Sequence, residues 1–239
     1  MDSSKKIVFH HIPKCGGMSI AAGLAITFFP WTLIRYGRRG FPGHLNAKKA
    51  SEDADKLNLD RYAYRRQLLE TNIGEDKVGF VFGHYPFSKA VAEKYPEWHY
   101  ITLMRDPVKR WYSEYFWNRY KDHDYAKTDL DIEEYLESEQ GQRDTRSYIN
   151  FLTEDNQVSS AIENLKYFSV IGQLENLPKF QSDLKSKLGR KPFFFKRNKS
   201  PAKPQDYKQP DENSDFHKKL LNLLEEDREI YSHVMSKYA

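Results

Sequence analysis

The segment from His10 to Ile20, HHIPKCGGMSI, has the residue types of an anion-binding loop. Lys14, Gly16 and Gly17 follow a short apolar run, and Ser19 opens an apolar segment of helical length. The first N–H groups of a helix have no partner within it and converge on phosphate, glycines let the backbone approach, and lysine adds positive charge. The lysine precedes the glycines, whereas it follows them in a Walker A motif. We therefore expect an anion cradle unlike that of an ordinary NTPase; a tight turn with a solvated lysine is the alternative.

A second basic segment, MRDPVKRWYSEYFW at residues 104–117, combines an arginine with a hydroxyl. Arg105 follows an apolar strand, and Ser113 lies two helical turns further on. Ligands bind at the carboxyl ends of strands in open α/β sheets, so Arg105 and Lys14 can contact two ends of one ligand. An arginine and a hydroxyl together hold a phosphate well. The alternative is that Asp106 only caps a helix while Arg105 forms a surface ion pair.

His84 is a candidate general base, because it follows the apolar run at 78–82 and Gly83. A neutral imidazole is the usual acceptor of a hydroxyl proton near neutral pH. The alternative is a turn histidine that only makes a hydrogen bond. His10 and His11 are further candidates for the base, although one of them should point into the core because side chains alternate along a strand.

Cys15 is the only cysteine, which excludes an intramolecular disulfide and leaves no Cys/His spacing of a zinc site. We expect no metal and a cytoplasmic location. At a helix start beside Lys14, an exposed Cys15 thiol should have a lowered pKa. The first apolar stretch, at residues 7–9, is too short for a signal peptide or a membrane span. The net charge of +4, without a block of like charges, argues against a nucleic-acid partner.

These residues must be positioned by the elements around them, and a chain of 239 residues suits a single α/β domain. Short apolar runs followed by helical segments predict a mostly parallel sheet covered on both faces. The aromatic residues at 111–120 and 193–195 have the spacing of packed helices or strands. Strands are predicted at 6–12, 78–82, 100–104 and 167–171, helices at 19–29, 60–70, 107–120, 129–153, 174–188 and 216–235, and exposed loops at 35–55 and 196–210.

The IPKCGGMS segment resembles the 5′-phosphosulfate loop of sulfotransferases that use 3′-phosphoadenosine 5′-phosphosulfate (PAPS). RDPVKRWYS resembles their 3′-phosphate motif, and the two occur in the family's order. The chain is most similar to carbohydrate sulfotransferases related to the heparan sulfate 2-O-sulfotransferases and their bacterial relatives. GHYPF at 83–87, VIGQLENL at 170–177 and RNKSP at 197–201 agree with that resemblance. Met18 and Cys15 stand where the family often has threonine.

The resemblance implies a P-loop-like, three-layer α/β fold that binds PAPS without a metal. It implies that His84 is the base and that Lys14 is also catalytic, with a carbohydrate or another hydroxylated metabolite as acceptor. The loops at 35–60 and 121–165 match nothing that identifies this acceptor. The resemblance assigns the cofactor to Lys14, Cys15, Gly16, Gly17, Met18 and Ser19 at the 5′-phosphosulfate, Arg105 and Ser113 at the 3′-phosphate, and a further loop of Arg197, Asn198, Lys199 and Ser200.

Two other classes remain open at this point. A P-loop kinase or NTPase would need a Walker lysine and acidic magnesium ligands, and neither is evident in the sequence. A non-catalytic anion-binding module would explain the basic residues without using His84.

Overall fold

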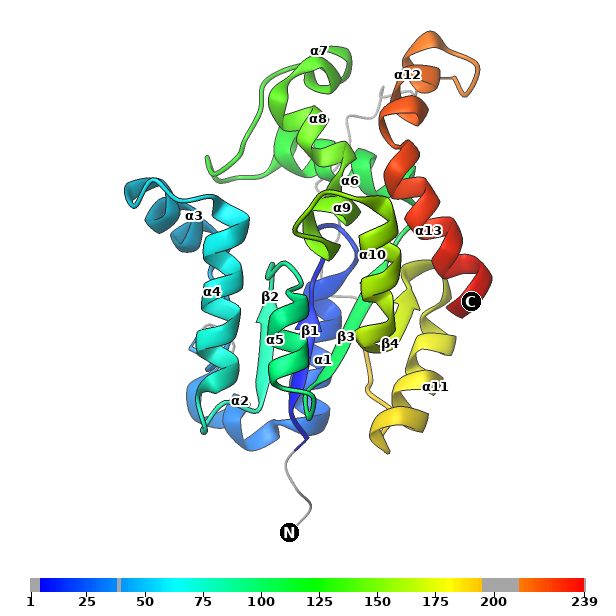
Figure 1. Cartoon of the computed structure of the whole chain (residues 1–239). Helices are drawn as coiled ribbons and strands as arrows, with labels where there is room; N and C mark the ends of the chain where they lie inside the picture. Colours follow the sequence, from blue (N-terminus) through cyan, green and yellow to red (C-terminus); the bar gives the residue numbers. More distant parts are fainter. Residues whose placement is uncertain (1–4, 38–39, 195–210, 239) are drawn as a thin grey trace.

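Figure 1 shows a computed structural model of the chain, which describes residues 5–37, 40–194 and 211–238. The described residues form a sheet of four parallel strands in the order β2-β1-β3-β4. Val8 in β1 pairs with Val81 on one side and with Tyr100 on the other. The predicted α/β fold with a parallel sheet is confirmed. The strands are β1 (Ile7–His10), β2 (Phe80–Gly83), β3 (His99–Met104) and β4 (Phe168–Gln173).

Helices cover both faces of this sheet, because its buried side chains alternate between two apolar clusters. Ile7 and Phe9 belong to one cluster, whereas Val8 between them belongs to the other. The first cluster includes residues of α1 (Gly17–Phe28) and α11 (Leu177–Leu188). The second includes residues of α4 (Arg61–Gly74), α5 (Lys89–Lys94), α9 (Ser147–Leu152), α10 (Val158–Asn164) and α13 (Glu225–Tyr238). The fold therefore has three layers, with α5 and α10 in front of the sheet in Figure 1.

A third apolar cluster lies beyond the carboxyl ends of the strands, at the top of Figure 1. It is built around α6 (Pro107–Tyr120), whose Trp111, Tyr115 and Phe116 are buried. Tyr135 and Leu220, from helices that follow in the chain, pack against them. These aromatic side chains are core residues, as their helical spacing predicted. The cluster fixes α6 above the edge of the sheet where the candidate residues lie.

The prediction of a loop at 35–55 was wrong in part, because this region contains two helices. These are the end of α2 (Pro30–Tyr36) and most of α3 (Ala47–Lys56). The Asn46 side chain caps α3 by accepting a hydrogen bond from the Lys49 N–H at 3.1 Å. Ala50 and Ala54 give α3 a buried face. This cap and the apolar spacing were the overlooked signals.

Two predicted helices are divided in the structure. Residues 129–153 form α7 (Ile132–Glu137), α8 (Glu139–Thr145) and α9, because Ser138 ends one helix and caps the next, its hydroxyl accepting from the Gly141 N–H at 3.1 Å. The C-terminal helix is broken at the buried Leu224 into α12 (Asp215–Leu223) and α13. Two short 3₁₀ helices, η1 (Leu165–Tyr167) and η2 (Leu174–Asn176), flank β4.

Gly189 ends α11 in the left-handed conformation, as predicted. Among the described residues, no single helix is both long and apolar enough to cross a membrane. Only α1 and α2 taken together reach that length and composition, and the pair is bent by 110°.

Candidate functional site

The candidate residues follow three neighbouring strands. Lys14 follows β1, His84 follows β2 and Arg105 follows β3, and β1 lies between the other two strands. All three strands are parallel, so their carboxyl ends meet at one edge of the sheet. The sequence prediction that these side chains lie at a common edge is therefore consistent with the order of the strands.

The loop between β1 and α1 leaves the start of α1 open. Lys14 and Gly16 both have positive φ, at 64° and 77°, so the chain turns sharply into the helix. Gly16 is the N-cap residue, no side chain caps α1, and its first turn contains no acidic residue. Gly17 allows a close approach, since a Cβ there would lie 1.8 Å from Cδ2 of His11. The amides and positive dipole end of α1 are thus not opposed by a side-chain carboxylate of that turn.

The Lys14 side chain reaches α6, where its Nζ lies 4.3 Å from the centre of the Trp117 ring. Burial lowers the pKa of Lys14 to about 8, and the negative charge of Glu114 acts against that shift. A lysine with this pKa is mostly protonated at pH 7. Sequence analysis missed Trp117 as a partner of Lys14. The available signal was its position one helical turn after Ser113.

Ser113 lies on the side of α6 that meets Lys14. Ser113 and Trp117 are four residues apart, so their side chains are neighbours on the helix surface. Ser113 is partly exposed, and no hydrogen bond from its hydroxyl to another described residue is found. This hydroxyl is therefore available to a ligand beside Lys14.

Arg105 and the Lys14 loop are tied together directly. Nη1 of Arg105 donates to the Lys14 carbonyl at 3.3 Å. The Tyr148 hydroxyl accepts from the Arg105 N–H at 2.9 Å and donates to the Arg105 carbonyl. The Tyr148 N–H in turn donates to the buried Asp227 carboxylate at 2.9 Å. Tyr148 and Asp227, which sequence analysis did not single out, therefore hold the Arg105 backbone in place.

Asp106 caps the helix that follows it, as the alternative interpretation of this segment predicted. Its carboxylate accepts from the Lys109 N–H at 2.9 Å and caps α6. The predicted surface ion pair of Arg105 is not found among the described residues. A backbone N–H at the start of α6 is therefore already hydrogen-bonded to the Asp106 carboxylate. Beside this helix start, the Arg105 side chain is the group that can contact an anion.

Cys15 departs from the expectation of a reactive thiol. Its side chain is buried, with Sγ 3.6 Å from the Pro13 carbonyl oxygen and 3.9 Å from the Tyr148 hydroxyl. Burial raises the pKa of the thiol to about 12. The helix start and Lys14 lower a thiol pKa only where water also reaches the sulfur, and here burial dominates. The Cys15 thiol is therefore no candidate for cofactor binding, and the Cys15 N–H donates to the Ile12 carbonyl at 3.4 Å.

A buried group of charges lies on the same helix as Ser113. Arg110 pairs with Glu114 at 3.4 Å, and its guanidinium also donates to the Asp144 carbonyl. Burial raises the pKa of Glu114 to about 7 and also raises that of Asp144. When ionised, Glu114 supplies negative charge near Lys14. The i,i+4 spacing of Arg110 and Glu114 in an aromatic helix was the signal for this pair.

Of His10, His11 and His84, His84 is the best placed to accept a proton. Its Nδ1 lies 2.9 Å from the His11 carbonyl oxygen. A carbonyl accepts only, so Nδ1 carries the proton and Nε2 of the neutral ring keeps its lone pair. Burial lowers the pKa of His84 to about 4, which keeps the ring neutral at pH 7.

His10 and His11 are placed less well for proton transfer. His10 packs edge-on against Phe151 and Phe168 in the core, and burial lowers its pKa to about 3. The His11 ring lies beneath Gly17 and 4.3 Å from the His84 ring, and burial lowers its pKa well below 6.5.

His44 joins this group without having been predicted. Its ring stacks on Phe82 at 4.7 Å, and its backbone pairs with Phe82 as an isolated bridge to β2. A charge on His44 would lower the pKa values of His11 and His84. His44 lies in the predicted loop at 35–55, where nothing in the sequence linked it to His84.

Part of the predicted site cannot be placed. Arg197, Asn198, Lys199 and Ser200 lie outside the described residues. Within the described ranges, no group of three or more His, Cys, Asp or Glu side chains is arranged to hold a metal ion. Of the aromatic residues near 194, Phe193 is exposed and Phe194 stacks on Phe180 at 5.8 Å.

The fold and this edge define an α/β protein with basic residues and a histidine at the ends of adjacent parallel strands. Comparison with protein-family models and with curated proteins found no match to the chain.

Proposed function

We propose that this protein is a cytoplasmic PAPS-dependent sulfotransferase that transfers a sulfuryl group to a hydroxyl of its acceptor. The observation that carries the proposal is the joining of two basic loops, through the 3.3 Å hydrogen bond from Arg105 to the Lys14 carbonyl, beside a neutral histidine. The two loops are those that resemble the family's 5′-phosphosulfate and 3′-phosphate motifs.

The residues present fit the donor. The open start of α1 offers amides from Gly17 and Met18, and Lys14 offers an ammonium group for the 5′-phosphosulfate. Arg105 and Ser113 offer a guanidinium and a hydroxyl for the 3′-phosphate. Because Tyr148 fixes the Arg105 backbone, the separation of the two anion sites is set before the ligand binds.

PAPS, when bound, supplies the sulfuryl group. In the proposed reaction Nε2 of His84 takes the proton of the acceptor hydroxyl as its oxygen forms a bond to sulfur. The bond from sulfur to the 5′-phosphate oxygen breaks, and the electron pair leaves with adenosine 3′,5′-bisphosphate (PAP). Lys14 and the α1 amides stabilise the negative charge that grows on that phosphate. The products are a sulfate ester and PAP.

The test is transfer of ³⁵S from labelled PAPS to a panel of sugars and simple alcohols, with PAP release measured in parallel. The proposal expects the wild-type chain to form equal amounts of sulfate ester and PAP, and His84→Ala to form them about 10²- to 10⁴-fold more slowly. A kinase or NTPase would instead consume ATP in a parallel magnesium-containing reaction, and an anion-binding module would bind PAP without any turnover. Either result would replace the proposed function.

A further inference from the structure

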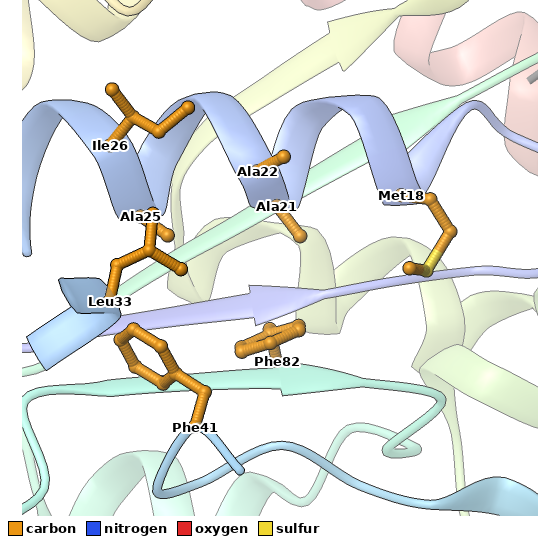
Figure 2. Close-up of a pocket in the computed structure, with 8 residues that line it drawn as sticks. All are labelled: Met18, Ala21, Ala22, Ala25, Ile26, Leu33, Phe41 and Phe82. Carbon is orange, nitrogen blue, oxygen red and sulfur yellow. The ribbon is translucent and has the colours of Figure 1, made fainter. Parts of the chain in front are cut away.

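An apolar pocket lies beside α1 (Figure 2). Its volume is about 110 Å³. Ala21, Ala22 and Ala25 of α1 form one wall, and Phe41 and Phe82 lie opposite. The small alanine side chains leave the space open, because a larger residue at these positions would reach the two rings.

The pocket leads to the candidate site at one end. Met18, in the first turn of α1, lines that end and is only partly buried. Figure 2 shows Met18 at the opposite end of the pocket from Leu33 and Ile26. Met18 directly follows Gly17 of the cradle. The pocket therefore starts beside the N–H groups that we assign to the sulfuryl donor.

The opposite wall leads to the proposed base. Phe82 is two residues before His84, and the His44 ring stacks on Phe82 at 4.7 Å. The His11 ring lies against Gly17, which directly precedes Met18, and its centre is 4.3 Å from that of the His84 ring. A molecule that fills the pocket from Leu33 to Met18 therefore ends between the donor site and His84.

The lining determines what can bind. All lining side chains are apolar. A sugar placed there would bury hydroxyl groups without hydrogen-bond partners, which costs free energy for each group. An alkyl or aryl group loses no hydrogen bonds and gains from leaving water.

Building on the proposed sulfotransferase function, we propose that the acceptor is an alcohol whose hydroxyl is attached to a short apolar segment, and that this segment occupies the pocket. A cavity of roughly 150 Å³ accepts benzene, so this smaller pocket suits an alkyl chain of about three to four carbons. The hydroxyl then lies at the Met18 end, where His84 removes its proton. Carbohydrate acceptors, which the sequence resemblance implies, fit this pocket poorly.

The test is a series of primary alcohols from ethanol to 1-octanol, with PAPS as donor and PAP release as the signal. Each added methylene should raise kcat/KM about 3- to 4-fold until the pocket is full, near four carbons. Glucose and N-acetylglucosamine should be poor acceptors. A series without chain-length dependence, or a sugar that exceeds 1-hexanol in kcat/KM, would overturn the apolar acceptor.

Two variants connect the chain-length dependence to the pocket. Leu33→Ala removes three carbons from the far end and should move the plateau to longer alcohols. Ala25→Leu fills space and should move it to shorter ones. Leu68→Ala, a similar change in a partly buried leucine of α4 on the other face of the sheet, should leave the plateau unchanged. If both pocket variants fold, as judged by thermal unfolding, and keep the wild-type plateau, the pocket does not hold the acceptor.

Binding of PAP to the wild-type chain, measured by calorimetry, separates this inference from the proposed function. If the protein binds PAP and transfers sulfuryl groups to alcohols of every chain length equally well, only the proposal that the pocket holds the acceptor is contradicted. If the protein does not bind PAP, the proposed sulfotransferase function is contradicted, and the proposed acceptor with it.

Discussion

The starts of α1 and α6 follow adjacent parallel strands, yet they are built differently. Gly16 opens α1, and neither a side-chain cap nor an acidic residue is present in its first turn. At α6 the Asp106 carboxylate caps the Lys109 N–H, and Pro107 follows it. The helix dipole at α1 is therefore available to an anion, whereas at α6 it is already occupied by the chain's own carboxylate.

The difference indicates how each loop would hold its phosphate. At α1 the binding groups are backbone amides, so affinity depends on the shape of the loop and on the absence of negative charge. At α6 they are the Arg105 and Ser113 side chains, so affinity depends on single groups, and the Arg105 group also donates to the Lys14 carbonyl. Neither loop contains His84, the proposed base, which follows β2 on the other side of β1.

The largest effect is therefore expected at His84, outside both loops. His84→Ala should reduce turnover about 10²- to 10⁴-fold, the usual range for general acid–base catalysis, while PAP affinity stays close to wild type. Turnover with labelled PAPS and calorimetry with PAP measure the two quantities. His217→Ala, in the distant α12, is the control and should change neither. A large loss of PAP affinity in His84→Ala would assign this residue to binding.

The pH profile sharpens the same assignment. Only the neutral ring accepts a proton, so the rate should fall as the pH drops through the pKa of His84, which burial lowers to about 4. Stability must be followed in parallel, because burial lowers the pKa of His10 to about 3 and that of His84 to about 4, below the 6.5 of an exposed histidine. The unfolded chain then binds protons that the folded chain does not, so the free energy of unfolding falls as pH drops below 6.5. An acid limb near 6.5 in a fully folded enzyme would contradict the assignment.

The next largest effect should separate the two helix starts. Ser19→Asp places a carboxylate in the open first turn of α1 and should weaken PAP binding by more than 100-fold, since like charges in contact cost about 3 kcal/mol or more. An acid at a helix start stabilises the helix, so the folded state should not suffer. Lys109→Asp, at the matching position of the capped α6, should weaken PAP binding less than 10-fold. Equal losses in the two variants would remove the distinction between the loops.

Arg105→Ala tests whether a side chain at the start of α6 binds the 3′-phosphate. Removing a charge-assisted hydrogen bond should cost about 1.5–3 kcal/mol, or about 10- to 150-fold in PAP affinity, with little change in thermal stability. Lys109→Ala removes an exposed charge from the same helix start and serves as the control. Wild-type affinity in a folded Arg105→Ala chain would move the 3′-phosphate site elsewhere.

The smallest effect is expected from the hydroxyl that fixes the Arg105 backbone. Tyr148→Phe keeps the ring and removes both hydrogen bonds to Arg105, so PAP affinity should fall about 3- to 10-fold. Tyr112→Phe is a matched control, because the buried Tyr112 hydroxyl has no hydrogen-bond partner among the described residues. It should leave PAP affinity unchanged and the folded state equally or more stable. The same affinity in both variants would mean that Tyr148 does not position the site.

Local patterns predicted the scaffold of the site better than its contacts. The strand ends that carry Lys14, His84 and Arg105 follow from apolar runs that stop at polar residues. Tyr148 was hidden within a region read as one helix, and its role depends on contacts with residues far away in the chain. The burial of Cys15 was also beyond local reasoning, because the thiol lies against the Tyr148 hydroxyl, 133 residues away in the chain. Sequence patterns indicate which groups gather at an edge, but not which of them face water.

In the proposed function, the two loops together bind an adenosine 3′,5′-bisphosphate group without a metal. Thermal unfolding of the whole chain with PAP, and separately with ATP and magnesium, tests it most directly. At about 100 times its Kd, PAP should raise the free energy of unfolding by roughly 2.7 kcal/mol, and EDTA should not reverse this. Stabilisation by ATP and magnesium, with no effect of PAP, would contradict the account.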